Sequence, residues 1–233
     1  MKKAFVIIMS IMVFGLMSSF AQKPFAGVIK SKYTVEGNVD ANVKASLPEE
    51  QVVYLYENYT KSVMEMPGIN VITITNGGAK MVYLIYDITG MGKYYIETTE
   101  AEIKEQLANM KTDYKYTGET KTIAGYVCEK VIETSVDNET DEETTTILYV
   151  SKDINPNADI NFGSHPGLVG YPLRTEVTRD INGENATIIV EAYEVKADKK
   201  VKLANFLLPA DGKKTTQKDL MKMFGMDEDE DED

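Results

Sequence analysis

Hydrophobic positions in the body of the chain alternate with polar ones over short stretches, a pattern typical of β-strands. The alternation is clearest from Leu173 to Ile181, where Leu173, Val177 and Ile181 share one side. Similar stretches rich in Thr, Val, Ile and Tyr recur between turn signals and predict a succession of strands. The predicted strands are 25–35, 51–60 with an extension to Pro67, 69–75, 80–88, 93–98, one resuming at Tyr114, 128–136, 143–150, 173–181 and 186–195.

Tight turns between consecutive strands predict an antiparallel meander. Asn76-Gly77 supplies the positive φ angles of a type I′ hairpin turn, and Asn182-Gly183 marks another turn. An acidic loop, 137–142, separates two further strands, and a long irregular loop spans Asn155 to Pro172. The pattern therefore predicts a mainly β protein with minor α content.

Two helices are predicted among the strands. Thr99 is expected to cap the first one, and Glu102 completes a capping box. Its apolar stripe, which is expected to lie against the sheet, comprises Ile103, Leu107 and Met110. A second, short helix is predicted from Thr216 to Phe224, with Gly225 ending it.

The N-terminus has the pattern of a signal peptide. Two lysines precede an apolar run from Ala4 to Met17, and small residues lead to a predicted cleavage between Ala21 and Gln22. The 14-residue run is too short to span a bilayer as a helix, although an uncleaved anchor is the alternative. No cysteine lies at the cleavage point to carry a lipid. We therefore expect an exported, periplasmic or secreted protein that neither spans the membrane nor is lipid-anchored.

The net charge of the chain bears on which binding partners it is expected to have. The chain carries 37 acidic and 25 basic residues, for a net charge of −12, and its last seven residues, 227–233, are all acidic. This balance argues against nucleic-acid binding and against charge-driven binding to anionic membranes. The predicted organisation is a signal peptide over 1–21, one β-rich domain over 22–225 and a disordered acidic tail over 226–233.

The chain has few of the histidine and cysteine residues that catalytic and metal sites often use. There is one histidine, His165, in the irregular loop, and one cysteine, Cys128, in a strand. Nucleophilic catalysis needs an assembled base, and zinc sites need several His or Cys ligands. The sequence therefore predicts no catalytic residue, no metal site and no cofactor. Cys128 is expected to be a buried apolar residue rather than a partner in a disulfide.

Apolar and aromatic side chains crowd three consecutive predicted strands. Two of these strands, 51–60 and 80–88, are apolar on both faces over part of their length. Either an ordinary core covered by a helix or a hydrophobic ligand cavity explains this pattern. The residues expected to line such a cavity are Tyr54, Tyr56, Met64, Met81, Tyr83, Ile103 and Leu107.

A family resemblance rests on the middle of the chain. Gly125-Tyr126-Val127-Cys128-Glu129 precedes a strand, and Tyr149-Val150-Ser151-Lys152-Asp153 ends a later one. These segments resemble the DUF4412 family of exported bacterial proteins, over about Phe25 to Leu208. The resemblance implies a fold similar to the LolA/LolB lipoprotein carriers, a curved antiparallel sheet or half-open barrel with one or two helices across its concave face. In those carriers the concave face holds acyl chains.

Two functions from different classes follow. The first is a soluble periplasmic carrier or binding protein, without catalysis, for lipid or lipoprotein acyl chains between the concave sheet and the helix 99–110. The alternative is a structural or interaction module of the cell envelope with no small ligand. A monomer is the favoured oligomeric state.

Overall fold

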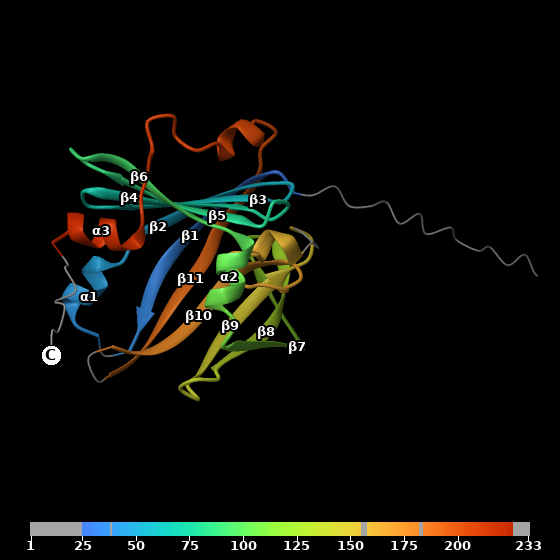
Figure 1. Cartoon of the computed structure of the whole chain (residues 1–233). Coiled ribbons are helices and arrows are strands. Elements are labelled where there is room, and N and C mark those ends of the chain that lie inside the picture. The colour runs from blue at the N-terminus through green and yellow to red at the C-terminus, as the bar shows by residue number, and fades with distance from the viewer. Residues whose placement is uncertain (1–24, 38, 155–157, 182–183, 226–233) are drawn as a thin grey trace, which may run out of the picture.

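The strands pair into a single curved sheet in the computed structural model, which describes residues 25–37, 39–154, 158–181 and 184–225 (Figure 1). The strands are β1 (Gly27–Glu36), β2 (Glu50–Tyr56), β3 (Tyr59–Met66), β4 (Ile69–Asn76), β5 (Met81–Ile88), β6 (Gly92–Thr98), β7 (Met110–Ile123), β8 (Tyr126–Asp137), β9 (Glu143–Ser151), β10 (Tyr171–Ile181), β11 (Glu184–Ala197) and β12 (Lys213–Lys214). The described helices are α1 (Ala41–Ser46), α2 (Glu100–Gln106) and α3 (Gln217–Met223), with 3-10 turns η1 (Ala158–Asn161) and η2 (Leu203–Phe206). The predicted mainly β class is confirmed.

The sheet consists of two meanders, the first formed by β1–β6 and the second by β7–β11, and the pairing of β1 with β11 joins them. Its order is β12-β6-β5-β4-β3-β2-β1-β11-β10-β9-β8-β7, and only the short β12–β6 pair is parallel. β1 pairs with β11 from Gly27↔Ala197 to Glu36↔Thr187. The sheet remains open between β12 and β7, and its two halves curve towards each other (Figure 1). The predicted curved antiparallel sheet is therefore confirmed.

Two local predictions about the first meander are wrong. The stretch 51–60 is two strands, because the chain turns at Glu57, whose φ of +51° places it in the left-handed region. No glycine or proline marks this turn in the sequence. The loop at Asn76-Gly77 does join β4 to β5, but Lys80, not Gly77, has the positive φ, of +53°. The hairpin is thus correct and the type I′ turn is not.

The caps of both predicted helices are present. In α2, the Glu102 backbone N–H donates to Thr99 Oγ1, and the Thr99 N–H donates to Glu102 Oε2 at 2.7 Å. In α3, Thr216 Oγ1 accepts from the Asp219 N–H at 3.1 Å, and Gly225 follows the helix with a φ of +69°. The first helix is shorter than predicted, because it ends at Gln106.

The shorter α2 separates the expected apolar stripe. Leu107 is the C-cap and is 39% exposed, whereas Met110 begins β7 and pairs with Asp137. Ile103 alone of the three lies within the helix. Pairing of β7 with β8 competes for these residues and extends the strand at the expense of the helix's last turn.

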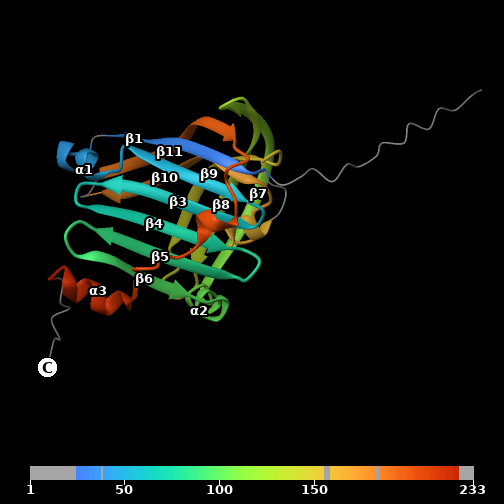
Figure 2. The same ribbon diagram turned by 90° about the horizontal axis from the view of Figure 1, so that it is seen from above.

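The segment after β11 crosses the outer face of the first meander (Figure 2). Val201 and Phe206 are buried there with Ile74 and Ile85. The Phe206 ring lies 5.6 Å from the Tyr59 ring and 6.4 Å from the Tyr56 ring, measured between centroids. The outer face of β2–β6 is therefore part of the core, covered by a segment that the sequence pattern did not predict.

Several predictions concern residues that the structure does not describe. The signal peptide, its cleavage site at Ala21 and Gln22, the turn at Asn182-Gly183 and the acidic tail over 226–233 lie outside the described ranges. Among the helices that the structure does describe, none combines the length and apolarity needed to cross a membrane.

Candidate functional site

The concave face of the sheet carries a half-buried apolar surface. Strand register places two neighbouring rows of side chains on this face of β2–β6. One row is Gln51, Met64, Val71, Tyr86 and Tyr94, and the next is Val53, Ser62, Thr73, Leu84 and Ile96. All except the buried Val53 retain partial exposure. This inner face therefore offers apolar surface that the rest of the chain does not fully cover.

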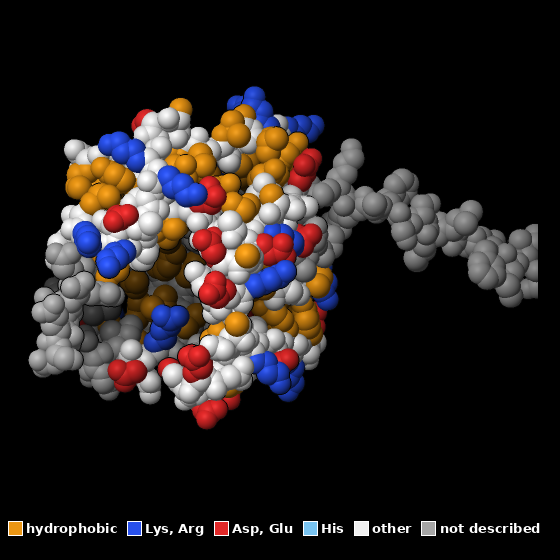
Figure 3. Space-filling view, in the orientation of Figure 1, with side chains coloured by type: hydrophobic (Ala, Val, Ile, Leu, Met, Phe, Trp, Pro, Cys, Tyr) orange, Lys and Arg blue, Asp and Glu red, His pale blue; other side chains and the backbone are white. Residues whose placement is uncertain are grey.

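A hollow is visible between the two halves of the sheet (Figure 3). It opens between the side of the molecule that carries α1 and α3 and the side that carries α2, and hydrophobic side chains line its floor (Figure 3). Exposed apolar surface inside a concavity is the usual setting of a small-molecule site. This hollow is the candidate functional site.

The loop 158–170 closes one end of the concave face. At the first meander, an added Cβ on Gly163 would lie 3.0 Å or less from the side chains of Thr75 and Val82, so the contact is close. The Asp159 carbonyl approaches Gly77 so closely that a Cβ there would lie 2.1 Å from the carbonyl oxygen. Lys80 also forms an ion pair with Asp159. These contacts hold the loop against the β4–β5 hairpin.

A polar pair attaches the same loop to the second meander. His165 Nδ1 lies 2.9 Å from Glu133 Oε2 on β8, and both side chains are largely buried. The Tyr114 hydroxyl donates to Glu133 Oε1 at 3.2 Å. Burial, together with the neighbouring Glu133 carboxylate, raises the pKa of Tyr114, so its hydroxyl stays protonated. His165 thus serves as a clamp between loop and sheet, in agreement with its predicted role as a loop residue.

A cavity of about 240 Å³ lies beneath this loop, between β1, β2, β10 and β11. Its walls include the Tyr33 and Tyr171 rings, and burial raises the pKa of both hydroxyls. The Tyr33 hydroxyl donates to Met64 Sδ at 3.2 Å, which connects the cavity wall to the apolar row. The remaining lining residues are Ser31, Gln51, Asn161, Ser164, His165, Pro172, Leu173, Thr175 and Val190.

The structure divides the seven predicted cavity residues between the two faces of the sheet. Tyr54, Tyr56 and Tyr83 pack against the outer cluster around Phe206, and Met81 shares their face by register. Met64 lies on the concave face, next to Val71.

The two helix positions lie elsewhere on the concave side. Ile103 and Leu107 line a smaller cavity of about 190 Å³ with Phe162 of the closing loop. The seven residues therefore do not line one space. The alternation pattern does not assign a face to strands that are apolar on both sides, so it could not separate Met64 from the three tyrosines.

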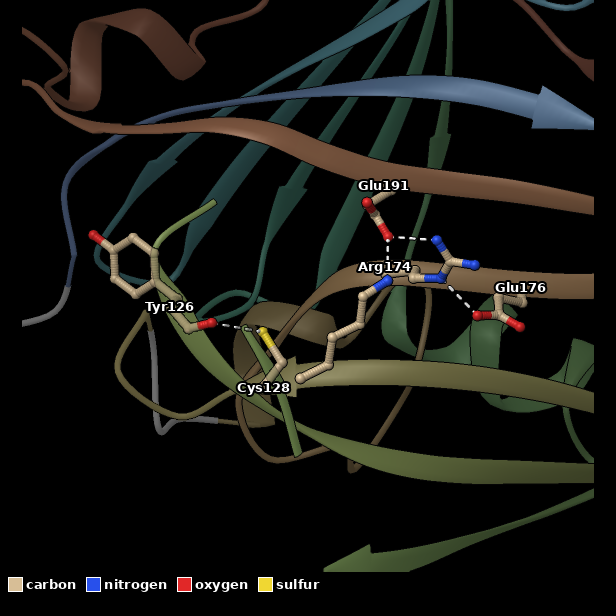
Figure 4. A network of polar contacts seen from close by, with 6 residues as sticks. Tyr126, Cys128, Arg174, Glu176 and Glu191 are labelled. Atoms are coloured by element: carbon tan, nitrogen blue, oxygen red, sulfur yellow. Dashed lines mark hydrogen bonds and ion pairs between the residues drawn. The ribbon is translucent and has the colours of Figure 1, made fainter. Parts of the chain in front are cut away.

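An ion network lies on the opposite face of the second meander (Figure 4). Arg174 Nε donates to Glu176 Oε1 at 2.6 Å, and its guanidinium also donates to Glu191, which accepts from Lys121 Nζ at 3.0 Å. Burial alone would raise the pKa of Glu191, but hydrogen bonds and attraction from Arg174 and Lys121 outweigh it and lower the pKa. Every charge in the network is paired, so its role is structural.

Cys128 is fully buried, as predicted. Its thiol lies 3.6 Å from the Tyr126 carbonyl oxygen (Figure 4), and its side chain belongs to the core cluster with Ile29 and Leu173. Burial raises the pKa of the thiol to about 11. The thiolate needed for nucleophilic or redox chemistry is therefore scarce at neutral pH.

Sequence reasoning missed the residues that shape the closed end. Asn161 is buried and its amide donates to the carbonyls of Leu168, at 2.8 Å, and Gly170. Glu133 occupies a strand position that reads as an ordinary polar residue. The one signal that Glu133 points inward is its position two residues from Val131, which places both side chains on the same face of β8.

Comparison with known proteins supports the fold and adds no activity. No protein-family model matches the chain, so the resemblance to the DUF4412 family stays a prediction. No curated protein matches either. Two solved structures of PNGF-II are similar, each with a TM-score of 0.53, at 17% and 16% identity over 85% and 86% of this chain. The chain spans 33% of the length of PNGF-II. At this identity the similarity establishes a shared fold alone.

Proposed function

We propose that this protein is an exported, non-catalytic carrier or binding protein for an apolar ligand, either a lipid or an acylated protein. The observation that carries the proposal is the half-exposed apolar surface on the concave face, with Met64, Val71, Leu84, Tyr86 and Ile96. Export rests on the signal-like N-terminus, and the choice of ligand rests on the resemblance to the DUF4412 family, whose fold is similar to that of the lipoprotein carriers.

The dimensions of this surface suit an extended acyl chain. The five strands β2–β6 lie roughly 4.8 Å apart, so a row across them extends over roughly 19 Å. Each methylene moved from water onto this surface contributes about 0.8 kcal/mol. A chain lying along the rows therefore gains affinity without any charged contact, and the flexible Met64 side chain can adapt to ligands of different shape.

The polar groups near the hollow support binding rather than catalysis. His165 and Glu133 are engaged with each other and with Tyr114, and they hold the closing loop in place. The Tyr33 hydroxyl is engaged with Met64. We infer that these groups shape the hollow and leave recognition to apolar contact.

Lipid extraction followed by mass spectrometry, on protein purified from the periplasm of its native cells, tests the proposal. A matched pair of variants localises the ligand. Val71→Trp places bulk on the concave face, whereas Val63→Trp adds the same bulk to the outer face, one strand away. We expect only Val71→Trp to weaken binding of a fluorescent fatty acid. Protein that yields no lipid and ignores such probes would refute the carrier function.

An interaction module of the cell envelope is the second candidate. β7 is a 14-residue strand at the edge of the sheet, so its outward backbone groups can pair with a strand of another chain. Cross-linking in intact cells followed by affinity capture tests this candidate. Recovery of the free monomer alone would count against it.

A further inference from the structure

The outward side of the C-terminal crossing segment combines exposed leucines with lysines. Val201 and Phe206 anchor the segment against the sheet, with 5% and 6% of their surfaces exposed. Between and beside these anchors, Leu203 is 49% exposed and Leu207 is 66% exposed. The anchored segment crosses the outer face of the first meander (Figure 2), and it therefore presents two large apolar side chains to solvent there.

Local charge at this segment is opposite to that of the whole chain. From Lys196 to Lys214 the sequence holds six lysines and two aspartates, a net charge of +4, against −12 for the protein. Lys199, Lys200 and Lys202 are exposed, and none of the ion pairs found between described residues holds their ammonium groups. Basic and hydrophobic side chains lie together at the top of the molecule (Figure 3).

We propose that this segment, 199–207, is a docking site for an anionic lipid bilayer. Lysines near such a surface are attracted to its headgroups, and neighbouring leucines can enter the boundary between headgroups and acyl chains. The two leucines project outward from a segment that Val201 and Phe206 anchor to the sheet. Projecting side chains suit shallow insertion into a bilayer better than they suit the binding of a ligand in a pocket. Overall composition argued against charge-driven membrane binding, but the acidic residues that dominate it lie outside this segment. The proposal does not require a ligand in the hollow.

Tryptophan fluorescence tests the insertion directly, because the chain contains no tryptophan. Leu207→Trp places one reporter in the segment, and Val127→Trp places a control at another exposed apolar position, 59% exposed. Both are made in the chain beginning at Gln22, since the apolar run Ala4–Met17 would itself bind vesicles. We expect a blue shift and quenching by brominated acyl chains for Leu207→Trp only, with vesicles of equal parts phosphatidylglycerol and phosphatidylcholine. Vesicles of phosphatidylcholine alone should give neither change.

Vesicle co-sedimentation tests the charge. Replacing Lys199, Lys200 and Lys202 together by glutamine should weaken binding on the order of a hundredfold, since each lysine contributes roughly fivefold. The control is a triple glutamine variant at exposed lysines of α2 and β7, which should bind as the parent does. Its positions are Lys104, Lys111 and Lys115. Equal loss in both variants, no binding by the parent, or binding to polyglutamate in place of vesicles would each overturn the proposal.

Discussion

Phe206→Ala tests whether the crossing segment belongs to the core. The side chain is 6% exposed and contacts the rings of Tyr56 and Tyr59. Truncating a buried phenylalanine costs about 3–5 kcal/mol, and the two ring contacts favour the upper half of that range. We expect the free energy of unfolding to fall by about 4 kcal/mol, a large fraction of the 5–15 kcal/mol of a typical domain.

Urea unfolding measures this loss, with Leu207→Ala as the matched control. Leu207 is the next residue and is 66% exposed, so its truncation should change stability by no more than about 0.5 kcal/mol. In thermal scans the same 4 kcal/mol corresponds to a fall in Tm of about 10 °C for a protein of this size. A double-mutant cycle with Tyr59→Leu should give a coupling of about 0.5–1.5 kcal/mol.

Equal small losses for the two variants would refute the reasoning. In that case the segment would not be packed on the sheet, and Tyr54, Tyr56 and Tyr83 would be free to line a ligand site on the outer face. A large loss for Phe206→Ala with no coupling to Tyr59 would place the phenylalanine in the core but contradict the ring contact.

Three further predictions concern packing and charge. Gly77→Ala should cost about 1–3 kcal/mol in urea unfolding, because its Cβ would meet a backbone oxygen at 2.1 Å, whereas the more open Gly78→Ala should be nearly neutral. Cys128 should resist a thiol-reactive dye at pH 8 until the protein unfolds, since its pKa is about 11; rapid labelling of the native protein would contradict its burial. The pKa of Glu191 is lowered from 4.5, so its contribution is complete above pH 4.5 and is lost as pH falls through the lower folded value. Unfolding curves for Glu191→Gln should therefore lie furthest below those of the parent above pH 4.5, and an equal gap at pH 2 would contradict the pairing with Arg174.

Much of the local structure could be predicted from the sequence. Strand periodicity, the caps at Thr99 and Thr216, and the end of α3 before Gly225 depend on contacts within a few residues. Consecutive hairpins follow from the same local information, because a tight turn forces adjacent strands to pair. The turn at Glu57 escaped prediction because a non-glycine residue adopts a left-handed conformation there.

The sequence predicted which strands carry the apolar residues of the candidate site, but not which of these residues face the hollow. Apolar side chains such as Met64 and Tyr83 occupy strands that are hydrophobic on both faces, so alternation does not tell which face is covered. Likewise, the contact between His165 and Glu133 joins two segments that lie far apart in the sequence, so no local pattern could predict it.

By itself, then, the sequence determined most of the strands, their antiparallel pairing and the small number of residues suited to nucleophilic or metal chemistry. Tertiary structure alone decided that Phe206 covers the outer tyrosines, that the loop around His165 closes one end, and that Met64 and Val71 face the open hollow. The physical reason is that burial depends on which distant segment packs most favourably on a surface. Which segment packs best depends on the complete fold, so a short stretch of sequence does not determine it.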